Sequence, residues 1–138
     1  MTDVSFRGSD KYEGRELPLF EKCENWKRSW ISQIEPYLKG NILEVGGGIV
    51  ANTRMLVGKS VTGVTILELL DPDNCAAIQC RFDKDPPAVP HSIRLGTIDS
   101  LDEGLAFDSI VYTDVLEHIK DDDVEIGQAT RRLRPGGF

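Results

Sequence analysis

Residues 42–56 read ILEVGGGIVANTRML, and this stretch decides the fold. A short apolar strand over residues 41–45 runs directly into three glycines, and a helix is expected from about residue 51 to 57. Glycine tolerates a positive φ and lets a ligand approach the backbone closely. The start of the helix offers unpaired N–H groups and the positive end of a dipole, which suit a carboxylate or a phosphate. The stretch therefore predicts a strand, a ligand-binding turn and a helix.

Strands and helices alternate along the rest of the chain. β-Branched runs indicate strands, and apolar residues at steps of three and four indicate helices. Regular alternation is typical of an α/β fold, here a doubly wound parallel sheet with helices on both faces. Ligands bind such sheets at the carboxyl ends of the strands, near the point where the strand order reverses. The predicted elements are a helix over 17–38, strands over 60–67, 92–98 and 108–115, and helices over 73–82 and 121–133.

The chain divides into two predicted parts. Residues 1–16 are polar and contain glycine, so they are expected to form a loose arm. With the helix over 17–38 they make up an N-terminal arm and cap helix, residues 1–40. Residues 41–138 then form the ligand-binding domain.

Composition excludes several classes of protein. The chain has 138 residues, of which 40% are hydrophobic, and a formal net charge of −7, which is ordinary for one globular domain. The acidic balance argues against nucleic-acid binding and against anionic membrane surfaces. No apolar run approaches the roughly 20 residues that span a bilayer, and the N-terminus has no apolar signal-peptide core. Three cysteines without a metal-ligand spacing predict buried, reduced thiols, a cytoplasmic protein and no metal site.

Two classes of cofactor compete for the glycine-rich turn. Gly46, Gly48 and Ala51 fit the dinucleotide pattern G-x-G-x-x-[GA], which alone is a weak signal. Glu44 favours the other class, because a carboxylate at the strand end would repel a pyrophosphate and attract an ammonium or a sulfonium. S-adenosylmethionine carries both cations, and it also has a carboxylate for the helix end.

Five segments resemble, in order, the motifs of class I S-adenosylmethionine-dependent methyltransferases. The glycine-rich stretch is similar to their first motif, E/D-x-G-x-G-x-G. The resemblance covers residues 41–138 and implies the Rossmann-like sheet of this class, with S-adenosylmethionine as cofactor. The four later segments are VTILELLDPD (64–73), LGTIDSL (95–101), FDSIVYTDVLEHIKDDD (107–123) and RRLRPGGF (131–138).

The resemblance implies a set of cofactor-binding residues. An acid after the second strand would accept hydrogen bonds from the ribose hydroxyls, and Glu68 fits this position best, with Asp71 as the alternative. By the same resemblance Glu44, Gly46 and Gly48 match the methionine end, Thr97 and Ile98 flank the adenine, and Tyr112, Thr113 and Asp114 lie beneath the sulfonium. Asp114 has the alternative role of capping the next helix.

Three further features bear on activity. His118 is the candidate catalytic base if the acceptor is protonated, because its free pKa lies near neutrality. Phe20, Trp26 and Trp30 are expected either to pack in the core, the favoured interpretation for the tryptophans, or to cover the cofactor. Val50 replaces the family's third glycine, so its side chain is expected to crowd the cofactor or to disfavour the required backbone angle.

Three functional hypotheses follow. The first is methyl transfer from S-adenosylmethionine to a small molecule. The second is a truncated or degenerate domain that binds the cofactor without turnover, and the third is a nicotinamide-dinucleotide-binding domain. The resembling fold has seven strands, so the C-terminal strands are expected to be missing here. The fourth strand would then expose an apolar edge (Ile110, Val111, Val115), through which the chain is expected to self-associate.

Overall fold

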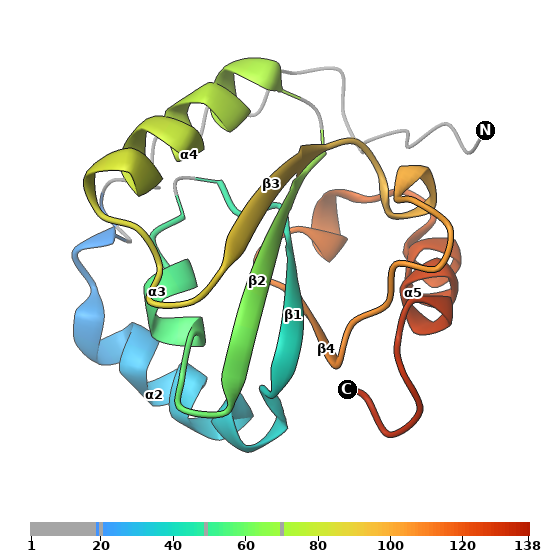
Figure 1. The fold of residues 1–138 in the computed structure, drawn as a ribbon, viewed down its shortest axis with the longest axis horizontal. Coiled ribbons are helices and arrows are strands. Elements are labelled where there is room, and N and C mark those ends of the chain that lie inside the picture. The colour runs from blue at the N-terminus through green and yellow to red at the C-terminus, as the bar shows by residue number, and fades with distance from the viewer. Residues whose placement is uncertain (1–18, 20, 49, 70) are drawn as a thin grey trace.

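The computed structural model describes residues 19, 21–48, 50–69 and 71–138, so the predicted arm over 1–16 and Phe20 lie outside the described residues. Helices and strands alternate as expected (Figure 1). The elements in chain order are α2 (Glu24–Ile34), the 3-10 turn η1 (Glu35–Tyr37), β1 (Gly40–Val45), α3 (Thr53–Leu56), β2 (Val61–Glu68), α4 (Pro72–Lys84), β3 (His91–Leu95), η2 (Ile98–Ser100), β4 (Ser109–Tyr112), η3 (Leu116–His118) and α5 (Asp122–Arg131).

The described strands form one parallel sheet in the order β3-β2-β1-β4. The chain moves outward from β1 through β2 to β3 and then returns to the other side of β1, so the strand order reverses between β1 and β4. Side chains of β1 alternate between the faces, with Ile42 on one and Leu43 on the other. The predicted doubly wound parallel sheet is confirmed.

Two apolar clusters, one on each face, hold the helices against the sheet. On the first face α2, α3 and α4 pack on the sheet through Ile31, Leu56 and Ile78, and on the second α5 and η2 pack through Ala129 and Ile98. Full burial of one such aliphatic side chain contributes about 1.5–3 kcal/mol. Because Ile31 of α2 shares a cluster with the strands, this helix packs on the same core as the sheet.

Two strands end earlier than the sequence predicted. The third ends at Leu95 because Gly96, at φ 147°, turns the chain, and Ile98 therefore lies in η2. The fourth ends at Tyr112 because Asp114 adopts φ 54°, outside the extended region. The predicted strands over 92–98 and 108–115 were too long, since apolar residues after the turn were counted as part of the strand.

The predicted helix over 17–38 is also divided, and its aromatic and thiol side chains are more exposed than expected. α2 begins only at Glu24 and gives way to η1, which has Pro36 in its first turn. Trp26 is 52% exposed, so the expectation that it packs in the core is wrong. The expectation of buried thiols is also wrong, because the three free cysteines are exposed or half-buried (Cys23, Cys75 and Cys80).

The outer edge of β4 is partly occupied. The Phe138 N–H donates to the Asp108 carbonyl (3.1 Å), and the Ile110 N–H donates to the Phe138 carbonyl (2.8 Å). These two hydrogen bonds have the pattern of a parallel bridge around Ser109. Val115 follows β4 in the chain but lies outside the strand, so the predicted apolar edge is shorter than expected.

We expect the outer edge of β4 to support concentration-dependent self-association, and Ile110→Lys, beside the hydrogen bonds to Phe138, should reduce it. Lysine on an edge strand opposes strand pairing because its charge would have to be desolvated. Light scattering coupled to size-exclusion chromatography measures this. The matched control is Ile126→Lys, on an exposed position of α5, which should leave association unchanged. A single monomeric species for the unsubstituted chain at high concentration would contradict the prediction.

Candidate functional site

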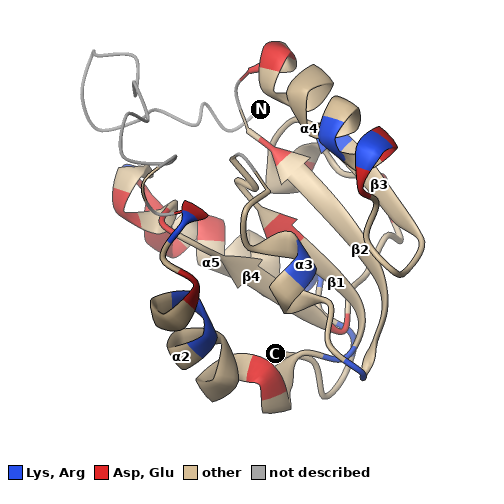
Figure 2. Cartoon of the chain, turned by 90° about the vertical axis from the view of Figure 1, so that its left-hand side faces the viewer, with Lys and Arg blue, Asp and Glu red and all other residues tan. Residues whose placement is uncertain are grey.

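Loops after all four strands meet at the carboxyl edge of the sheet. β1 and β2 are in register at their ends, with Val45 opposite Leu67, and β4 ends beside β1, with Tyr112 opposite Val45. The Gly46 N–H donates to the Leu67 carbonyl (2.8 Å), which fixes the start of the glycine loop against β2. Figure 2 shows acidic residues, in red, at the carboxyl ends of β1 and β2. The structure thus gathers at one edge Glu44, Gly46, Gly48, Glu68, Thr97 and Asp114.

Three of the described residues in the glycine loop adopt left-handed backbone angles. Gly46, Gly48 and Val50 have φ of 70°, 53° and 52°. A Cβ at Gly46 would lie 2.4 Å from Cγ2 of Val115, whereas the nearest heavy atom to a Cβ at Gly48 is the Gly46 carbonyl oxygen, 4.0 Å away. Gly46 is therefore required for close packing, and Gly48 leaves open space in which a ligand can approach the backbone.

Val50 has a left-handed backbone angle, which is unusual for a β-branched residue, and its side chain points into the protein. It is 6% exposed and belongs to the first-face cluster. Cγ1 of Val50 lies 3.5 Å from the position of a Cβ on Gly47. The Val50 side chain thus belongs to the core, and burial of this side chain offsets the unfavourable backbone angle.

We expect Val50→Ala to destabilise the protein more than Val50→Gly, the reverse of the usual order. Alanine keeps the cost of the left-handed angle, about 1–2 kcal/mol, and loses two buried methyl groups. Glycine loses the whole side chain but removes that cost. Urea unfolding of the two variants beside the parent measures the difference, and a larger loss for Val50→Gly would contradict it.

Glu44 is a buried carboxyl group directly beneath the glycine loop. Its side chain is 1% exposed, and its Oε2 accepts a hydrogen bond from Oγ1 of Thr53 (2.5 Å). Its Cδ lies 4.0 Å from the position of a Cβ on Gly47. Burial raises the pKa of Glu44 to about 7, and the hydrogen bond from Thr53 opposes part of this shift. A cation in the loop would stabilise the ionised form.

The two candidate ribose acids have different surroundings. Glu68 is the last residue of β2 and is 7% exposed, and its Oε1 accepts from Nδ2 of Asn74 at 3.5 Å. Asp71 caps α4, because its Oδ1 accepts from the Asp73 N–H (2.9 Å). The cap uses one carboxylate oxygen of Asp71, whereas Glu68 lies at the sheet edge itself. Leu70, between them, lies outside the described residues.

Thr97 and Ile98 lie beside Glu68, because the Gly96 N–H donates to the Glu68 carbonyl (2.9 Å). Thr97 caps η2 through reciprocal hydrogen bonds with Ser100. Ile98 is fully buried in the second-face cluster. An adenine at this position would therefore contact the main chain of Ile98, since its side chain belongs to the core.

Asp114 and His118 lie on the segment that follows β4, Asp114 before the short turn η3 and His118 at its end. Asp114 is exposed and lines a pocket, and its predicted capping role is not observed because Val115 occupies the N-cap of η3 without a side-chain cap. His118 lies in η3, with its Nε2 4.0 Å from Oε1 of Glu117. His118 is not among the residues that line the pocket.

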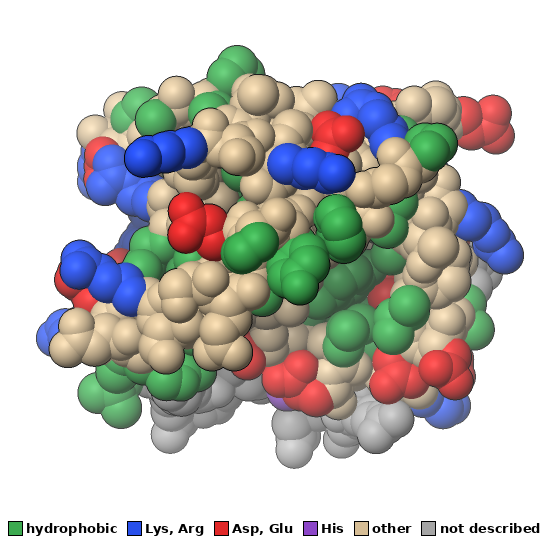
Figure 3. Space-filling view, turned by 90° about the horizontal axis from the view of Figure 1, so that it is seen from below, with side chains coloured by type: hydrophobic (Ala, Val, Ile, Leu, Met, Phe, Trp, Pro, Cys, Tyr) green, Lys and Arg blue, Asp and Glu red, His purple; other side chains and the backbone are tan. Residues whose placement is uncertain are grey.

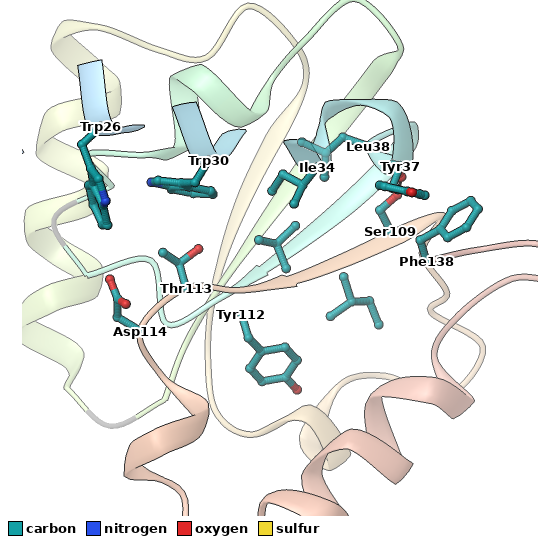
Figure 4. A pocket seen from close by; sticks show the side chains of 12 residues that line it. Trp26, Trp30, Ile34, Tyr37, Leu38, Ser109, Tyr112, Thr113, Asp114 and Phe138 are labelled. Atoms are coloured by element: carbon teal, nitrogen blue, oxygen red, sulfur yellow. Dashed lines mark hydrogen bonds between the residues drawn. The ribbon is translucent and has the colours of Figure 1, made fainter. Parts of the chain in front are cut away.

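A pocket of about 460 Å³ runs between α2 and β4. In a view from below, hydrophobic side chains surround a hollow on this face (Figure 3). At one end Trp26 and Trp30 lie near Thr113 and Asp114 (Figure 4). Trp30 is half-buried against the first-face cluster. The two indole rings pack edge to face with centroids 6.3 Å apart, so aromatic surface and one carboxylate face the same space.

Three buried polar atoms have no hydrogen-bond partner in the described part of the chain: Nε1 of Trp30, Oγ1 of Thr113 and Oδ1 of Asn52. Buried polar atoms are nearly always paired, so each of these marks a place where a partner is absent. Asn52 directly precedes α3, next to the glycine loop. Sequence reasoning missed Asn52, and the only available signal was its position at the start of the predicted helix.

The described residues contain neither a metal-binding cluster nor a membrane-spanning helix. Among the described residues no group of three or more His, Cys, Asp or Glu side chains is arranged to hold a metal ion. No helix in that part of the chain is long and apolar enough to cross a bilayer.

Comparisons with known proteins agree with this geometry. The family model described as "Methyltransferase domain" matches residues 43–138. A curated relative, the ubiquinone biosynthesis O-methyltransferase of Paramagnetospirillum magneticum, is 32% identical over 108 residues, which are 77% of this chain and 41% of that protein.

Solved structures share the fold. The glycopeptide N-methyltransferase MtfA complexed with S-adenosylmethionine has a TM-score of 0.64 and 22% identity, over 81% of this chain and 50% of that one. A S-adenosylmethionine-dependent methyltransferase from Clostridium acetobutylicum has a TM-score of 0.66 and 15% identity, over 90% of this chain and 52% of that one. The chain thus spans about half the length of these structures and less than half of the curated relative.

Proposed function

The chain belongs to the methyltransferase domain family, and we propose that it binds S-adenosylmethionine in the glycine loop and transfers the methyl group to a small-molecule acceptor. The observation that carries this proposal is the buried Glu44 carboxyl group beneath an open glycine turn. A site for a pyrophosphate would place no carboxylate there, because like charges in a partly buried site repel strongly.

The residues around the loop fit the chemistry of this cofactor. Glu44 offers a negative charge to an ammonium or sulfonium, and Oδ1 of Asn52, directly before α3, offers an unpaired acceptor. Gly48 leaves room at the backbone. Glu68, at the end of β2, offers carboxylate oxygens to a pair of hydroxyl groups. Together these groups match the methionine and ribose ends of S-adenosylmethionine.

In the proposed reaction, the protein contributes mainly by holding the cofactor and the acceptor in position. When bound, S-adenosylmethionine supplies a methyl group on a sulfonium whose leaving thioether is neutral and needs no proton. The protein then has to align the acceptor with the methyl group and exclude water. We assign to Asp114, which follows β4 and lines the pocket, the role of accepting a proton from the acceptor. We favour Asp114 over His118 for this role, because only Asp114 lines the pocket.

An oxygen atom is the proposed acceptor. The curated relative is an O-methyltransferase by name, and an oxygen acceptor suits a pocket wall that carries Asp114 and Thr113. The free thiols of the described structure suit a reducing compartment, and we place the protein in the cytoplasm.

Isothermal titration of the folded chain with S-adenosylmethionine and S-adenosylhomocysteine tests the proposal. We expect both to bind, and NADH fluorescence to remain unchanged on mixing. Absence of heat from both ligands on protein with a cooperative unfolding transition would overturn it. Binding without turnover across an acceptor panel would retain the cofactor site and reject methyl transfer by this chain.

A further inference from the structure

Thr53 is a buried residue whose hydroxyl group contacts the acid beneath the glycine loop. It is the first residue of α3, and its side chain is fully buried. Its Oγ1 donates a hydrogen bond to Oε2 of Glu44 (2.5 Å). α3 packs on the first face of the sheet through Leu56, which is also fully buried. The packing of α3 on the core therefore fixes the position of the Thr53 hydroxyl group.

The neighbours of Glu44 across the sheet are apolar. In the strand register Glu44 lies opposite Ile66 of β2 and Val111 of β4, and Glu44 itself is 1% exposed. Thr53 therefore supplies the side-chain hydrogen bond that the carboxyl group receives within the described part of the chain. Because Oε2 is engaged by Thr53, the other oxygen, Oε1, remains for a proton or a cation.

Burial and this hydrogen bond act on the charge of Glu44 in opposite directions. Burial raises the pKa of the carboxyl group to about 7, and the hydrogen bond from Thr53 lowers it, because a donor stabilises the ionised form. No charge of a described residue contributes to this pKa. Arg54, the next residue of α3, is exposed and pairs with Asp85. Among the described residues, Thr53 is thus the group that favours the ionised carboxyl group.

We propose that Thr53 is a positioning residue for cofactor binding: its hydroxyl group orients the Glu44 carboxyl group so that Oε1 remains available to the cation of the cofactor. The inference rests on the proposed function, because it assigns a second residue to the site that would bind S-adenosylmethionine. Thr53 acts through Glu44 and needs no contact with the ligand. Its hydroxyl group should therefore set the pH range in which a cationic ligand binds, which a residue with a purely structural role would not do.

Two substitutions of Thr53 separate orientation from packing. Thr53→Val keeps the volume and removes the donor, whereas Thr53→Ser keeps the donor and removes one buried methyl group. The matched control is Thr65→Val, because Oγ1 of Thr65 shares a hydrogen bond with Oγ of Ser92 (3.1 Å) at a half-buried position of β2. Urea unfolding of the three variants beside the parent measures how much each change costs the fold.

The titration of Glu44 without any ligand is the first measurement. Carbon-13 NMR of the side-chain carboxyl carbon follows its ionisation between pH 5 and pH 9, and Glu44→Gln identifies the signal. We expect the midpoint to lie about one pH unit higher in Thr53→Val than in the parent, because the ionised form loses a charge-assisted hydrogen bond. Thr53→Ser and Thr65→Val should keep the parent midpoint. An equal midpoint in Thr53→Val and the parent would overturn the assignment.

Isothermal titration then shows whether this orientation matters for the cofactor. The probes are S-adenosylmethionine and 5′-methylthioadenosine, which shares the adenosine part but has neither the sulfonium nor the ammonium. At pH 7 we expect Thr53→Val to weaken S-adenosylmethionine binding about tenfold, the loss expected for one hydrogen bond to a charged group. Binding of 5′-methylthioadenosine should not change. Equal losses for the two probes would overturn the proposal, because Thr53 would then act on the fold of the site.

The parent chain keeps this inference distinguishable from the proposed function. If the parent does not bind S-adenosylmethionine, the proposed function fails, and the assignment of Thr53 to a cofactor site fails with it. If the parent binds the cofactor and Thr53→Val binds it with the same affinity at every pH, the assignment of Thr53 alone fails. The expected result is tighter binding of S-adenosylmethionine with rising pH in both proteins, with the midpoint displaced to higher pH in Thr53→Val.

Discussion

Replacing Glu44 by Gln is expected to weaken S-adenosylmethionine binding about 10- to 100-fold at pH 8 and, at the same pH, to stabilise the folded protein. The loss of affinity follows from removal of a charged partner for the cation, since hydrogen bonds to charged groups contribute about 1.5–3 kcal/mol. The gain in stability follows from the burial of Glu44, whose pKa is raised to about 7. If Glu44→Gln lowers cofactor affinity and raises the stability of the folded protein, then Glu44 serves binding at the expense of stability.

The pH dependence of stability has a definite sign. Below the ordinary glutamate pKa of about 4.5 the group is protonated in both the folded and unfolded states. Between that value and about 7 the folded state retains a proton that the unfolded state has lost, so stability falls as pH rises. The total effect is on the order of 3 kcal/mol, at about 1.4 kcal/mol per pKa unit. Thermal unfolding of parent and Glu44→Gln at pH 5 and pH 8 should therefore diverge at the higher pH.

Cofactor affinity should depend on pH in the opposite direction. A bound cation favours the ionised carboxylate, so binding should tighten as pH rises toward about 7 and level off above it. Glu44→Gln should remove this dependence. The matched control is Glu125→Gln on the other face of the sheet, where burial also raises the pKa of a carboxyl group that accepts a hydrogen bond from Tyr112. Reduced cofactor binding in Glu125→Gln of the same size would contradict a specific role for Glu44.

Replacing Gly46 by Ala is expected to destabilise the protein by about 2–5 kcal/mol and to abolish measurable cofactor binding. The left-handed angle at φ 70° costs a residue with a Cβ about 1–2 kcal/mol. The added Cβ would also lie 2.4 Å from Cγ2 of Val115, and overpacking of this kind costs about 1–3 kcal/mol. Urea unfolding and titration with S-adenosylmethionine measure the two effects.

Two further variants separate these contributions. Gly104→Ala isolates the backbone cost, because Gly104 has φ 84° and nothing within 4 Å of an added Cβ. Gly46→Ala combined with Val115→Ala removes the clash, so the double variant should recover part of the lost stability relative to the sum of the single variants. Strict additivity of the two substitutions would contradict the contact.

Local patterns predicted the elements well, and the contacts between distant segments could not be predicted. The stretch around Glu44 and Gly46 gave the correct strand, turn and helix, because apolar periodicity and glycine act locally. The predicted ends of the third and fourth strands were wrong, because single backbone angles at Gly96 and Asp114 redirect the chain. The burial of Ile98 depends on how η2 packs against the second face, which no local pattern encodes.

In the candidate site, too, local patterns could be predicted and contacts between distant segments could not. The motif predicted Glu44 as an acid near the ligand, but its burial and its hydrogen bond from Thr53 arise from the packing of α3 on the sheet. Trp30 and Thr113 are 83 positions apart in the sequence and share one pocket. An unpaired polar atom can be recognised only when all its neighbours are known, so the sequence showed the position of Asn52 at the start of a helix but not its unpaired Oδ1.

The contact between Val115 and Gly46 couples the glycine loop to the loop that follows β4. The contact joins the loop that would hold the cofactor to the loop that carries Asp114. A ligand that fixes the conformation of one loop therefore also affects the conformation of the other. Such coupling is reciprocal: the factor by which bound cofactor changes the affinity for the acceptor equals the factor by which bound acceptor changes the affinity for the cofactor. We therefore expect each ligand to raise the affinity for the other by the same factor, and Val115→Ala should bring that factor close to one.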